Sequence, residues 1–347
     1  MNRYLGRQLA ALGTLAVFAA VPAAAQDNTG YHVTHRYTVG GEGGWDYLTP
    51  DTAGHRLYVS RSTHVQVINT DDGTLAGDIQ NTLGVHGIAI ASDLNRGFTS
   101  NGRDSSVTVF DLRSLATIST VKITGANPDA ILYEPMTRRV FTMNGRSANA
   151  SAIDAATGAL AGVVELHGRP EFAQADGRGR IYVNIEDSSQ IVAFNARTLQ
   201  VEARWSIAPC DGPSGLALDR EHNVLFSVCG NGMMAVVDAN TGRLITTLPI
   251  GRGVDGAGFD PGSQNAFASC GGDGVMTVVH EDSPNHFTLV GNAPTQRGAR
   301  TVGVDVRTHR IYLPTAEFGP VPAAVAGQRP GRPPVIPNSF VVLVVEK

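Results

Sequence analysis

Residues 98–111 read FTSNGRDSSVTVFD, and the same pattern returns at residues 141–154 as FTMNGRSANASAID. Each copy places an aromatic residue before an Asn-Gly-Arg corner, and an alternating apolar run that ends in Asp follows the corner. Two interpretations compete for this pattern. The corner is either a catalytic or ligand-binding signature, or one period of a structural repeat whose corners partly serve as scaffolding.

The aromatic position of this pattern marks a repeat that runs through the whole chain. It recurs at intervals of 40 to 45 residues, at Tyr58, Phe98, Phe141, Tyr182, Phe226, Phe267 and Tyr312. Each copy lies in a β-favouring segment such as RLYVS or RIYVN, and Gly, Asn and Asp turns separate it from alternating strands such as VTVFD. Seven copies at this spacing predict an all-β fold, a seven-bladed β-propeller with four strands in each blade.

The two ends of the chain predict how the ring closes. The seventh copy stops before its fourth strand, while residues 31–39, YHVTHRYTV, form one strand without partners of its own. The N-terminal strand is therefore expected to complete the last blade, which removes two exposed sheet edges. Residues 317–338 are rich in proline, so they are expected to form a loop insertion between the second and third strands of blade seven.

The first 25 residues read as a secretory signal peptide. Arg3 and Arg7 precede an apolar run from Leu9 to Val21, and Ala23–Ala25 offer small residues for cleavage after Ala25. The apolar run is too short to span a bilayer as a helix. We therefore expect a periplasmic or secreted protein without a membrane span, in which residues 26–347 form a single domain and a monomer.

The charge of the chain argues against broad nucleic-acid binding. Its formal net charge is -4, and removal of two arginines and no acids with residues 1–25 makes it -6. Nucleic-acid binding usually requires a basic face that displaces counterions. The sequence requires no cofactor, and a divalent metal ion is the one option that its carboxylates leave open.

Three cysteines enter an oxidising compartment if the protein is exported, so a disulfide is expected there. Cys210 precedes the first strand of blade five and Cys229 follows the second strand of the same blade, which places both on one rim. This pair is the predicted disulfide. The rival pair is Cys229 with Cys270, which occupy equivalent positions in adjacent blades, and the state of Cys270 stays open.

The seven RxYVx, VxVID and TG periods resemble the YVTN repeat, and residues 31–347 as a whole resemble YncE-like seven-bladed β-propellers. The segments YVS, FTS and YVN replace the Tyr-Val-Thr-Asn motif that gives the repeat its name. The resemblance implies an exported repeat protein. One branch of that family is associated with single-stranded DNA, and related propellers include lactonases and redox enzymes, so the resemblance implies a fold and not a reaction.

Polar residues are expected to converge on one face of such a propeller, because the corners before the first strand and after the second strand lie at the same end of each blade. The first set of corners contributes Trp45, Asp46, His86, Asn127, Asp129, Arg169, Glu171, Asp255, Arg297 and Arg300. The second set contributes Asn101, Arg103, Asn144, Arg146, Glu186 and Glu317. The arginines among them either bind a zwitterionic or anionic small molecule or form salt bridges between blades.

These residues predict a binding protein for a small-molecule or protein ligand. The enzymatic alternative is a lactonase- or lyase-like activity in the same funnel, with Asp and Glu side chains and His86 polarising the substrate or holding a divalent ion. The second alternative is single-stranded nucleic-acid binding, for which Trp45 is the strong stacking candidate. The spacing of GRGVDG, residues 251–256, does not indicate a dinucleotide site, because the chain lacks βαβ units.

Overall fold

The computed structural model describes residues 29–322, 331 and 333–347. The predicted signal peptide, and residues 323–330 and 332 of the predicted loop insertion, lie outside the described residues. Within the part that is described, no helix has the length and apolar character that crossing a membrane requires.

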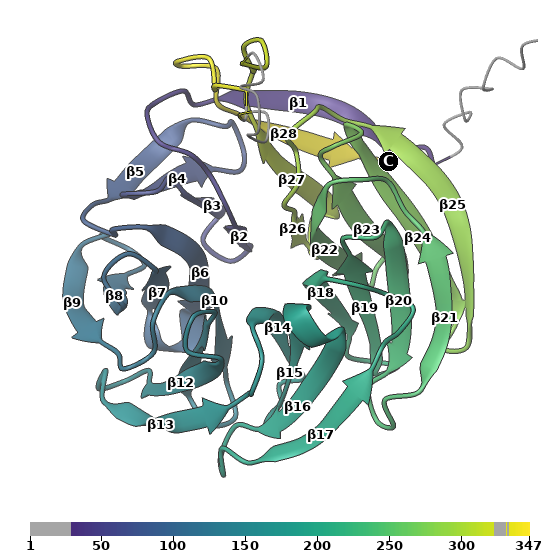
Figure 1. The fold of residues 1–347 in the computed structure, drawn as a ribbon. Helices are drawn as coiled ribbons and strands as arrows, with labels where there is room; N and C mark the ends of the chain where they lie inside the picture. The colour runs from purple at the N-terminus through teal and green to yellow at the C-terminus, as the bar shows by residue number, and fades with distance from the viewer. Residues whose placement is uncertain (1–28, 323–330, 332) are drawn as a thin grey trace, which may run out of the picture.

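The described chain forms seven four-stranded antiparallel sheets around one axis, which confirms the seven-bladed propeller (Figure 1). The first strands surround the axis and are β2 (Leu48–Asp51), β6 (Val85–Ala91), β10 (Pro128–Glu134), β14 (Pro170–Ala175), β18 (Pro213–Asp219), β22 (Val254–Asp260) and β26 (Gly303–Asp305). The second strands are β3 (Arg56–Ser60), β7 (Arg96–Asn101), β11 (Arg139–Asn144), β15 (Arg180–Ile185), β19 (Val224–Cys229), β23 (Asn265–Cys270) and β27 (Arg310–Thr315).

The third and fourth strands complete each blade toward the outside. The third strands are β4 (Val65–Asn69), β8 (Ser106–Asp111), β12 (Asn149–Asp154), β16 (Gln190–Asn195), β20 (Met233–Asp238), β24 (Val275–Ser283) and β28 (Val341–Glu346). The outermost strands are β5 (Leu75–Ile79), β9 (Thr117–Lys122), β13 (Leu160–Glu165), β17 (Val201–Ser206), β21 (Leu244–Pro249), β25 (His286–Pro294) and β1 (His32–Thr38).

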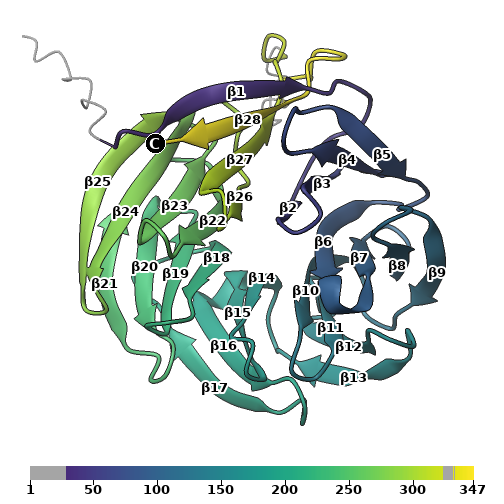
Figure 2. The same cartoon turned by 180° about the vertical axis from the view of Figure 1, so that it is seen from behind.

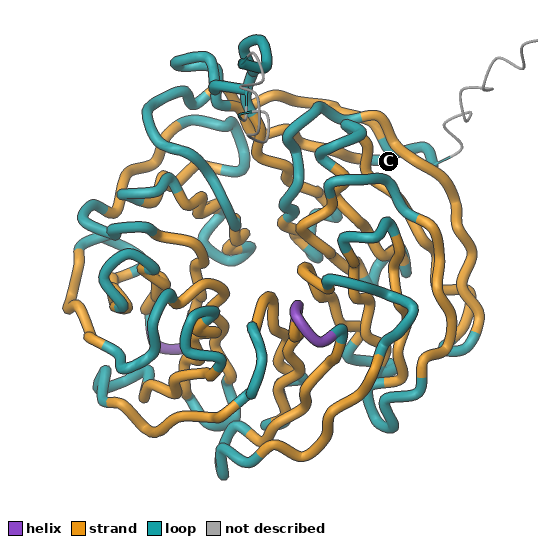
Figure 3. The backbone as a smooth tube through the Cα atoms, viewed as in Figure 1, coloured by secondary structure: helices purple, strands orange, loops and turns teal. Residues whose placement is uncertain are grey.

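Strands make up nearly all of the regular structure, and loops and turns join them (Figure 3). The described helical segments are two short 3-10 turns, η1 (Ser92–Leu94) and η2 (Glu186–Ser188). The turn η2 is seen in front in Figure 1 and η1 in front in Figure 2, so they lie on opposite faces of the ring. We number the blades one to seven in chain order, with β2–β5 as blade one.

The N-terminal strand closes the ring, as the sequence predicts. Strand β1 pairs with β28 in antiparallel register, from His32 opposite Glu346 to Thr38 opposite Val341, with an irregularity between Val33 and His35. The sheet order is β1-β28-β27-β26, so the two ends of the described chain share blade seven. Because the ring is closed, the first blade packs on the last, and neither of them exposes a free sheet face.

The repeated aromatic residue fills the core between neighbouring blades. All seven members are 0–2% exposed. Phe141 packs on Phe194 of the next blade with ring centroids 5.5 Å apart, and Tyr58 packs on Phe110 in the same way at 5.6 Å. The spacing of the repeat is therefore the spacing of contacts that join blade to blade.

An arginine at the start of the second strand forms a second repeated contact between blades. Arg96 Nη1 donates to the carbonyl of Ala155 in the next blade at 3.0 Å, and Arg139 Nη1 donates to the carbonyls of Ala196 at 2.7 Å and Arg197 at 2.9 Å. Equivalent bonds start from Arg56, Arg180 and Arg310. We call these contacts the interblade arginine bonds.

Residues 98–111 serve as scaffolding both at their Asn-Gly-Arg corner and at their final Asp. The buried Asn101 donates to Ser106 Oγ at 3.0 Å and Thr108 Oγ1 at 2.9 Å and accepts from Thr99 Oγ1 at 2.8 Å. Asp111 Oδ1 accepts from the amides of the following turn at 2.8–2.9 Å. In blade three, Asn144 makes the equivalent contacts with Thr142, Asn149 and Ser151.

The proline-rich insertion leaves blade seven between β27 and β28, as predicted. Its described ends pair with each other: the amide of Gly319 donates to the carbonyl of Pro334 at 2.8 Å, and the amide of Ile336 donates to that of Glu317 at 2.9 Å. These bonds hold the base of the insertion beside the ring.

Replacement of Arg139 by Met tests the interblade arginine bonds. The variant keeps an unbranched apolar stem and loses two charge-assisted hydrogen bonds, so we expect a loss of about 2 kcal/mol in the free energy of unfolding. Urea denaturation measures it. Arg178→Met is the control, because that exposed side chain makes no hydrogen bond or ion pair within the described residues. Equal midpoints for the two variants would contradict the assignment.

Candidate functional site

The two sets of corners lie on one face of the ring, because backbone hydrogen bonds join them within each blade. The amide of Gly102 donates to the carbonyl of Gly84 at 2.9 Å, and that of Gly145 donates to Asn127 at 3.0 Å. The same bond joins Glu186 to Arg169, Gly230 to Gly212 and Gly271 to Gly253. We call this the corner face.

Eight charged side chains of the corner face form two sets of ion pairs near the axis, and the proximity of Glu171 to Asp129 and Asp255 joins the sets into what we call the axial cluster. Its acids are Asp46, Asp129, Glu171, Glu186 and Asp255, and its basic members are His86, Arg169 and Arg300. The members come from six of the seven blades: seven lie just before or at the start of a first strand, and Glu186 lies directly after the second strand β15. The sequence predicts all eight, and the ring brings them together.

His86 of β6 lies between two carboxylates. Its Nδ1 is 2.7 Å from Asp46 Oδ2 and 3.7 Å from Asp129 Oδ1. Burial lowers the pKa of His86, but the hydrogen bond with Asp46 and the charges of Asp129 and Asp46 outweigh it, so the pKa is raised above its ordinary value. A Cβ at Gly102 would lie 2.8 Å from Nε2, so the glycine of the Asn-Gly-Arg corner makes room for the ring.

Arg300 joins three blades at the axis. Its Nη1 donates to Asp46 Oδ1 of blade one at 3.2 Å and to Asp255 of blade six, and its Nη2 donates to the carbonyl of Trp45 at 3.2 Å. Arg169 pairs instead with Glu186 of its own blade and lies 4.0 Å from Glu171. For Arg300, the predicted alternative of salt bridges between blades therefore holds.

Two carboxyl groups of the axial cluster lack sufficient positive charge around them. Burial, reinforced by the charges of Asp46 and Asp255, raises the pKa of Asp129 to about 6 despite the opposing charge of His86. Burial and the proximity of Asp129 and Glu186 raise the pKa of Glu171 to about 9. At neutral pH one of these neighbours is ionised and the other holds a proton.

An aromatic pair lies beneath the axial cluster. Tyr47 of blade one packs on Phe172 of blade four with ring centroids 5.1 Å apart, so its side chain reaches across the axis. Burial, followed by the charges of Asp129, Asp46, Asp255 and Glu171, raises the pKa of the Tyr47 hydroxyl well above its ordinary value. The hydroxyl therefore lies among the carboxyl groups. Nothing in the repeat pattern indicated either residue.

The remaining predicted residues lie around the cluster or inside the blades. Arg103, Arg146 and Arg297 are exposed on the corner face, and no ion pair reaches them within the described chain. Asn127 is at a corner with φ of 56°. Exposed Glu317 lies at the base of the insertion. Asn101 and Asn144 are buried, and their polar atoms are used inside blades two and three.

Trp45 is covered on one side by the insertion and the core. Its ring centroid is 6.1 Å from that of Phe318 and 5.5 Å from that of Phe340. Its Nε1 is buried and has no hydrogen-bond partner within the described residues. This packing makes Trp45 a poor platform for stacking successive bases.

A hollow of about 210 Å³ adjoins Arg300 on the corner face. It is lined by Arg297, Arg300, Phe318, Pro333 and the backbone of glycines 253, 271, 272 and 298. Phe318 and Pro333 were not predicted, although the aromatic residue directly after a polar corner was a signal in the sequence. The hollow gives the arginine side of the axial cluster direct contact with solvent.

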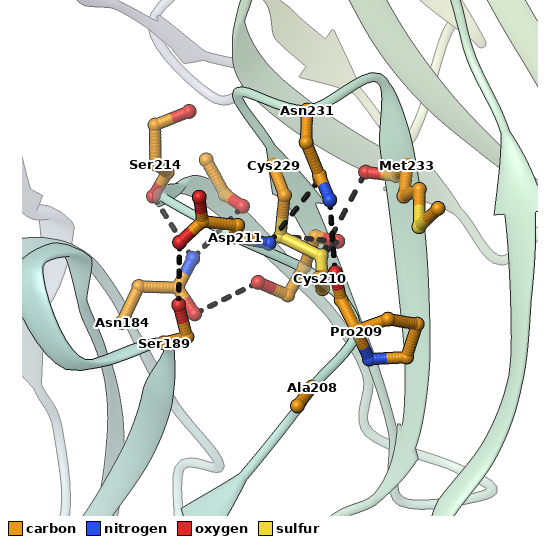
Figure 4. The surroundings of a disulfide bond; sticks show 12 residues. Asn184, Ser189, Ala208, Pro209, Cys210, Asp211, Ser214, Cys229, Asn231 and Met233 are labelled. Carbon is orange, nitrogen blue, oxygen red and sulfur yellow. Dashed lines mark hydrogen bonds between the residues drawn. A yellow bond between two sulfur atoms is a disulfide. The ribbon is translucent and has the colours of Figure 1, made fainter.

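The predicted disulfide is present on the corner face. Cys210 before β18 and Cys229 at the end of β19 are bonded, with their Cα atoms 5.7 Å apart (Figure 4). Asp211, next to the bond, accepts from Ser189 Oγ at 3.0 Å, and Asn231 donates to the carbonyl of Pro209 at 2.8 Å. Cys270 is a free, buried thiol, so the rival pairing is excluded.

Comparisons with known proteins identify the fold. No protein-family model matches the chain, and no curated protein matches its sequence. Among solved structures, the RRP9 WD40 repeats share 10% identity over 91% of this chain and 97% of theirs, with a TM-score of 0.74. The Kuenenia stuttgartiensis hydrazine synthase shares 14% identity over 78% of this chain and 92% of its own, with a TM-score of 0.67. A chain of the mitotic checkpoint complex shares 15% identity over 89% of this chain and 96% of its own, with a TM-score of 0.69.

Replacement of Glu171 by Gln tests the charge imbalance at the axis. A folded-state pKa near 9 means that folding takes up a proton between about pH 4.5 and 9, so stability falls as pH rises through this window. Gln cannot ionise. We expect the free energy of unfolding of the variant to exceed that of the wild type by about 5 kcal/mol at pH 8 and to match it near pH 4.

Urea denaturation at four pH values between 4 and 8 measures this difference. Glu165→Gln on the outer strand β13 is the control, since its exposed carboxylate lies away from the axis. A pH-independent difference between Glu171→Gln and wild type would show that Glu171 ionises normally in the fold.

Proposed function

We propose that this protein is an exported, YncE-like propeller that binds a zwitterionic small molecule on its corner face. The observation that carries the proposal is the composition of the axial cluster, in which five carboxyl groups face three basic groups above an aromatic pair. An ammonium group supplies the missing positive charge and packs favourably on aromatic rings.

The exposed arginines supply the second half of this recognition. Arg103, Arg146 and Arg297 lie at the edge of the corner face without ion-pair partners in the described chain. A guanidinium fork suits a ligand carboxylate. A ligand with its ammonium group at the axis and its carboxylate toward the edge therefore matches the order of charges from the inside outward.

Export is supported by the N-terminal sequence and by the cysteines. Arg3, Arg7 and the apolar run that follows have the pattern of a secretory signal. A disulfide between Cys210 and Cys229 persists in an oxidising compartment. The seven repeat periods support the relationship to YVTN-repeat propellers.

Ligand binding is expected to release protons. Because Glu171 holds a proton at neutral pH, an incoming ammonium group favours its ionised form, and affinity should rise between pH 6 and 8. Isothermal titration in two buffers of different ionisation enthalpy measures this release. Amino acids are the probes, each compared with the amine that lacks its carboxylate and the acid that lacks its ammonium group.

The double variant Asp129→Asn, Glu171→Gln is expected to bind the amino acid about 10 to 100 times more weakly, the cost of losing charge-assisted hydrogen bonds. Glu165→Gln is expected to bind like the wild type. The proposal would be contradicted if the acids that lack an ammonium group bind, and bind the double variant as tightly as the wild type.

A lactonase- or lyase-like reaction is the second candidate, favoured by the pKa values of about 6 and 9 at neighbouring carboxyl groups. Such a separation provides an ionised base beside a protonated acid. Turnover of lactones or hydroxy acids that is lost in His86→Ala and kept in Glu165→Gln would support it. Equal turnover in both variants would rule out this site.

A further inference from the structure

The interblade arginine bond is missing between blades five and six, and another group of side chains occupies its place. Blade five starts its second strand with Val224 where five other blades have Arg. In blade six, the second strand begins at Asn265, which pairs with His280, and Glu281 comes directly after His280. The corresponding residues of the preceding blades are small or apolar, namely Thr70, Leu112, Ala155, Ala196 and Ala239.

Glu281 faces Asp219, the last residue of the first strand of blade five, and His222 in the turn that follows it. His222 Nδ1 lies 2.9 Å from Glu281 Oε1 and 2.7 Å from Asp219 Oδ2. Ligand atoms of the three residues all lie within 4.8 Å of one another. This group is on the face opposite the corner face, where β18 ends, and is separate from the axial cluster.

The carboxylate of Glu281 is buried without sufficient partners. Its side chain is 0% exposed, and neither oxygen accepts an aligned hydrogen bond within the described residues. Asp219 is 4% exposed, and its oxygens accept the amides of Glu221 at 3.0 Å and His222 at 3.2 Å, which fixes the carboxylate in place. Two buried acids beside one imidazole are costly unless a cation joins them.

We propose that Asp219, His222 and Glu281 bind a divalent transition-metal ion that links blades five and six. One imidazole nitrogen and two carboxylate groups are a ligand set that Zn²⁺ and Mn²⁺ accept, with water completing the shell. The ion takes the place of the proton on His222 Nδ1. A cavity of about 130 Å³, whose lining includes His222, Asp238, Arg243 and Asn285, adjoins the site and provides room for water.

The next pair of blades provides a matched control. Asp260 ends the first strand of blade six, and its two oxygens lie 3.0 Å and 3.1 Å from Nδ1 of His309, which is in the turn between the first and second strands of blade seven. No third acid joins this pair in the metal-ligand groups of the described chain. It therefore reproduces the Asp–His contact without the carboxylate that completes the proposed site.

Tag-free protein, stripped with EDTA, is titrated with Zn²⁺ and separately with Mn²⁺ by calorimetry, and bound metal is counted by elemental analysis. We expect one Zn²⁺ per chain at this site. Glu281→Ala, which installs the residue of three other blades, should weaken Zn²⁺ binding by more than about 100-fold, since even loss of an outer-shell partner costs 10- to 100-fold. His309→Ala should bind like the wild type.

The His86→Ala variant separates this site from any metal bound at the axial cluster, and it is expected to keep the Zn²⁺ equivalent. A shift of the wild-type melting temperature upward with Zn²⁺ gives a readout that does not depend on the folding of the variants. Absence of Zn²⁺ uptake and of this shift in the stripped wild type would overturn the proposal, as would undiminished binding by folded Glu281→Ala.

Discussion

The pairing of β1 with β28 is the constraint on which the rest of the molecule depends. It joins residues 32–38 to residues 341–346, the two ends of the described chain, in a single sheet. Without this strand, blade seven would have three strands and an open edge. Closure is what places the seven first strands around a common axis and makes their corners neighbours.

The same closure forces charges together that are distant in the sequence. Asp46 and Arg300 belong to blades one and seven and meet at 3.2 Å only because the ring is closed. Asp129, Glu171 and Asp255 are brought toward the same axis, and the available basic groups do not balance them. The fold thus holds a repulsive arrangement at its centre, as proteins often do where a ligand binds.

The sequence predicted the fold from the spacing of one aromatic residue, because that residue makes the contact between blades. Its corners also indicated the axial cluster, since seven members lie just before or at the start of a first strand and Glu186 lies directly after a second strand. The role of Asn101 was not predictable in the same way, because only the register of β7 with β8 shows that Ser106 and Thr108 use its polar atoms. Tyr47 was missed because its partner, Phe172, lies across the axis in blade four.

Departures from the repeat carry information that the repeat itself does not. The arginine at the start of the second strand was part of the pattern, but its partner is a backbone carbonyl of the next blade, which has no sequence signature. Once that contact is known, Val224 and Glu281 are both seen to depart from the repeat at the same interface between blades. A missing arginine in one blade and an added buried acid in the next are a coupled change at one interface.

The titration of Glu171, followed by carbon-detected NMR of its carboxyl group and assigned with Glu171→Gln, tests the central claim most directly. If the closed ring brings five carboxyl groups together with only three basic groups, the titration midpoint of Glu171 is expected well above pH 7. A midpoint near 4.5, the ordinary value of a glutamate, would show that the axial cluster is balanced or that its members do not meet.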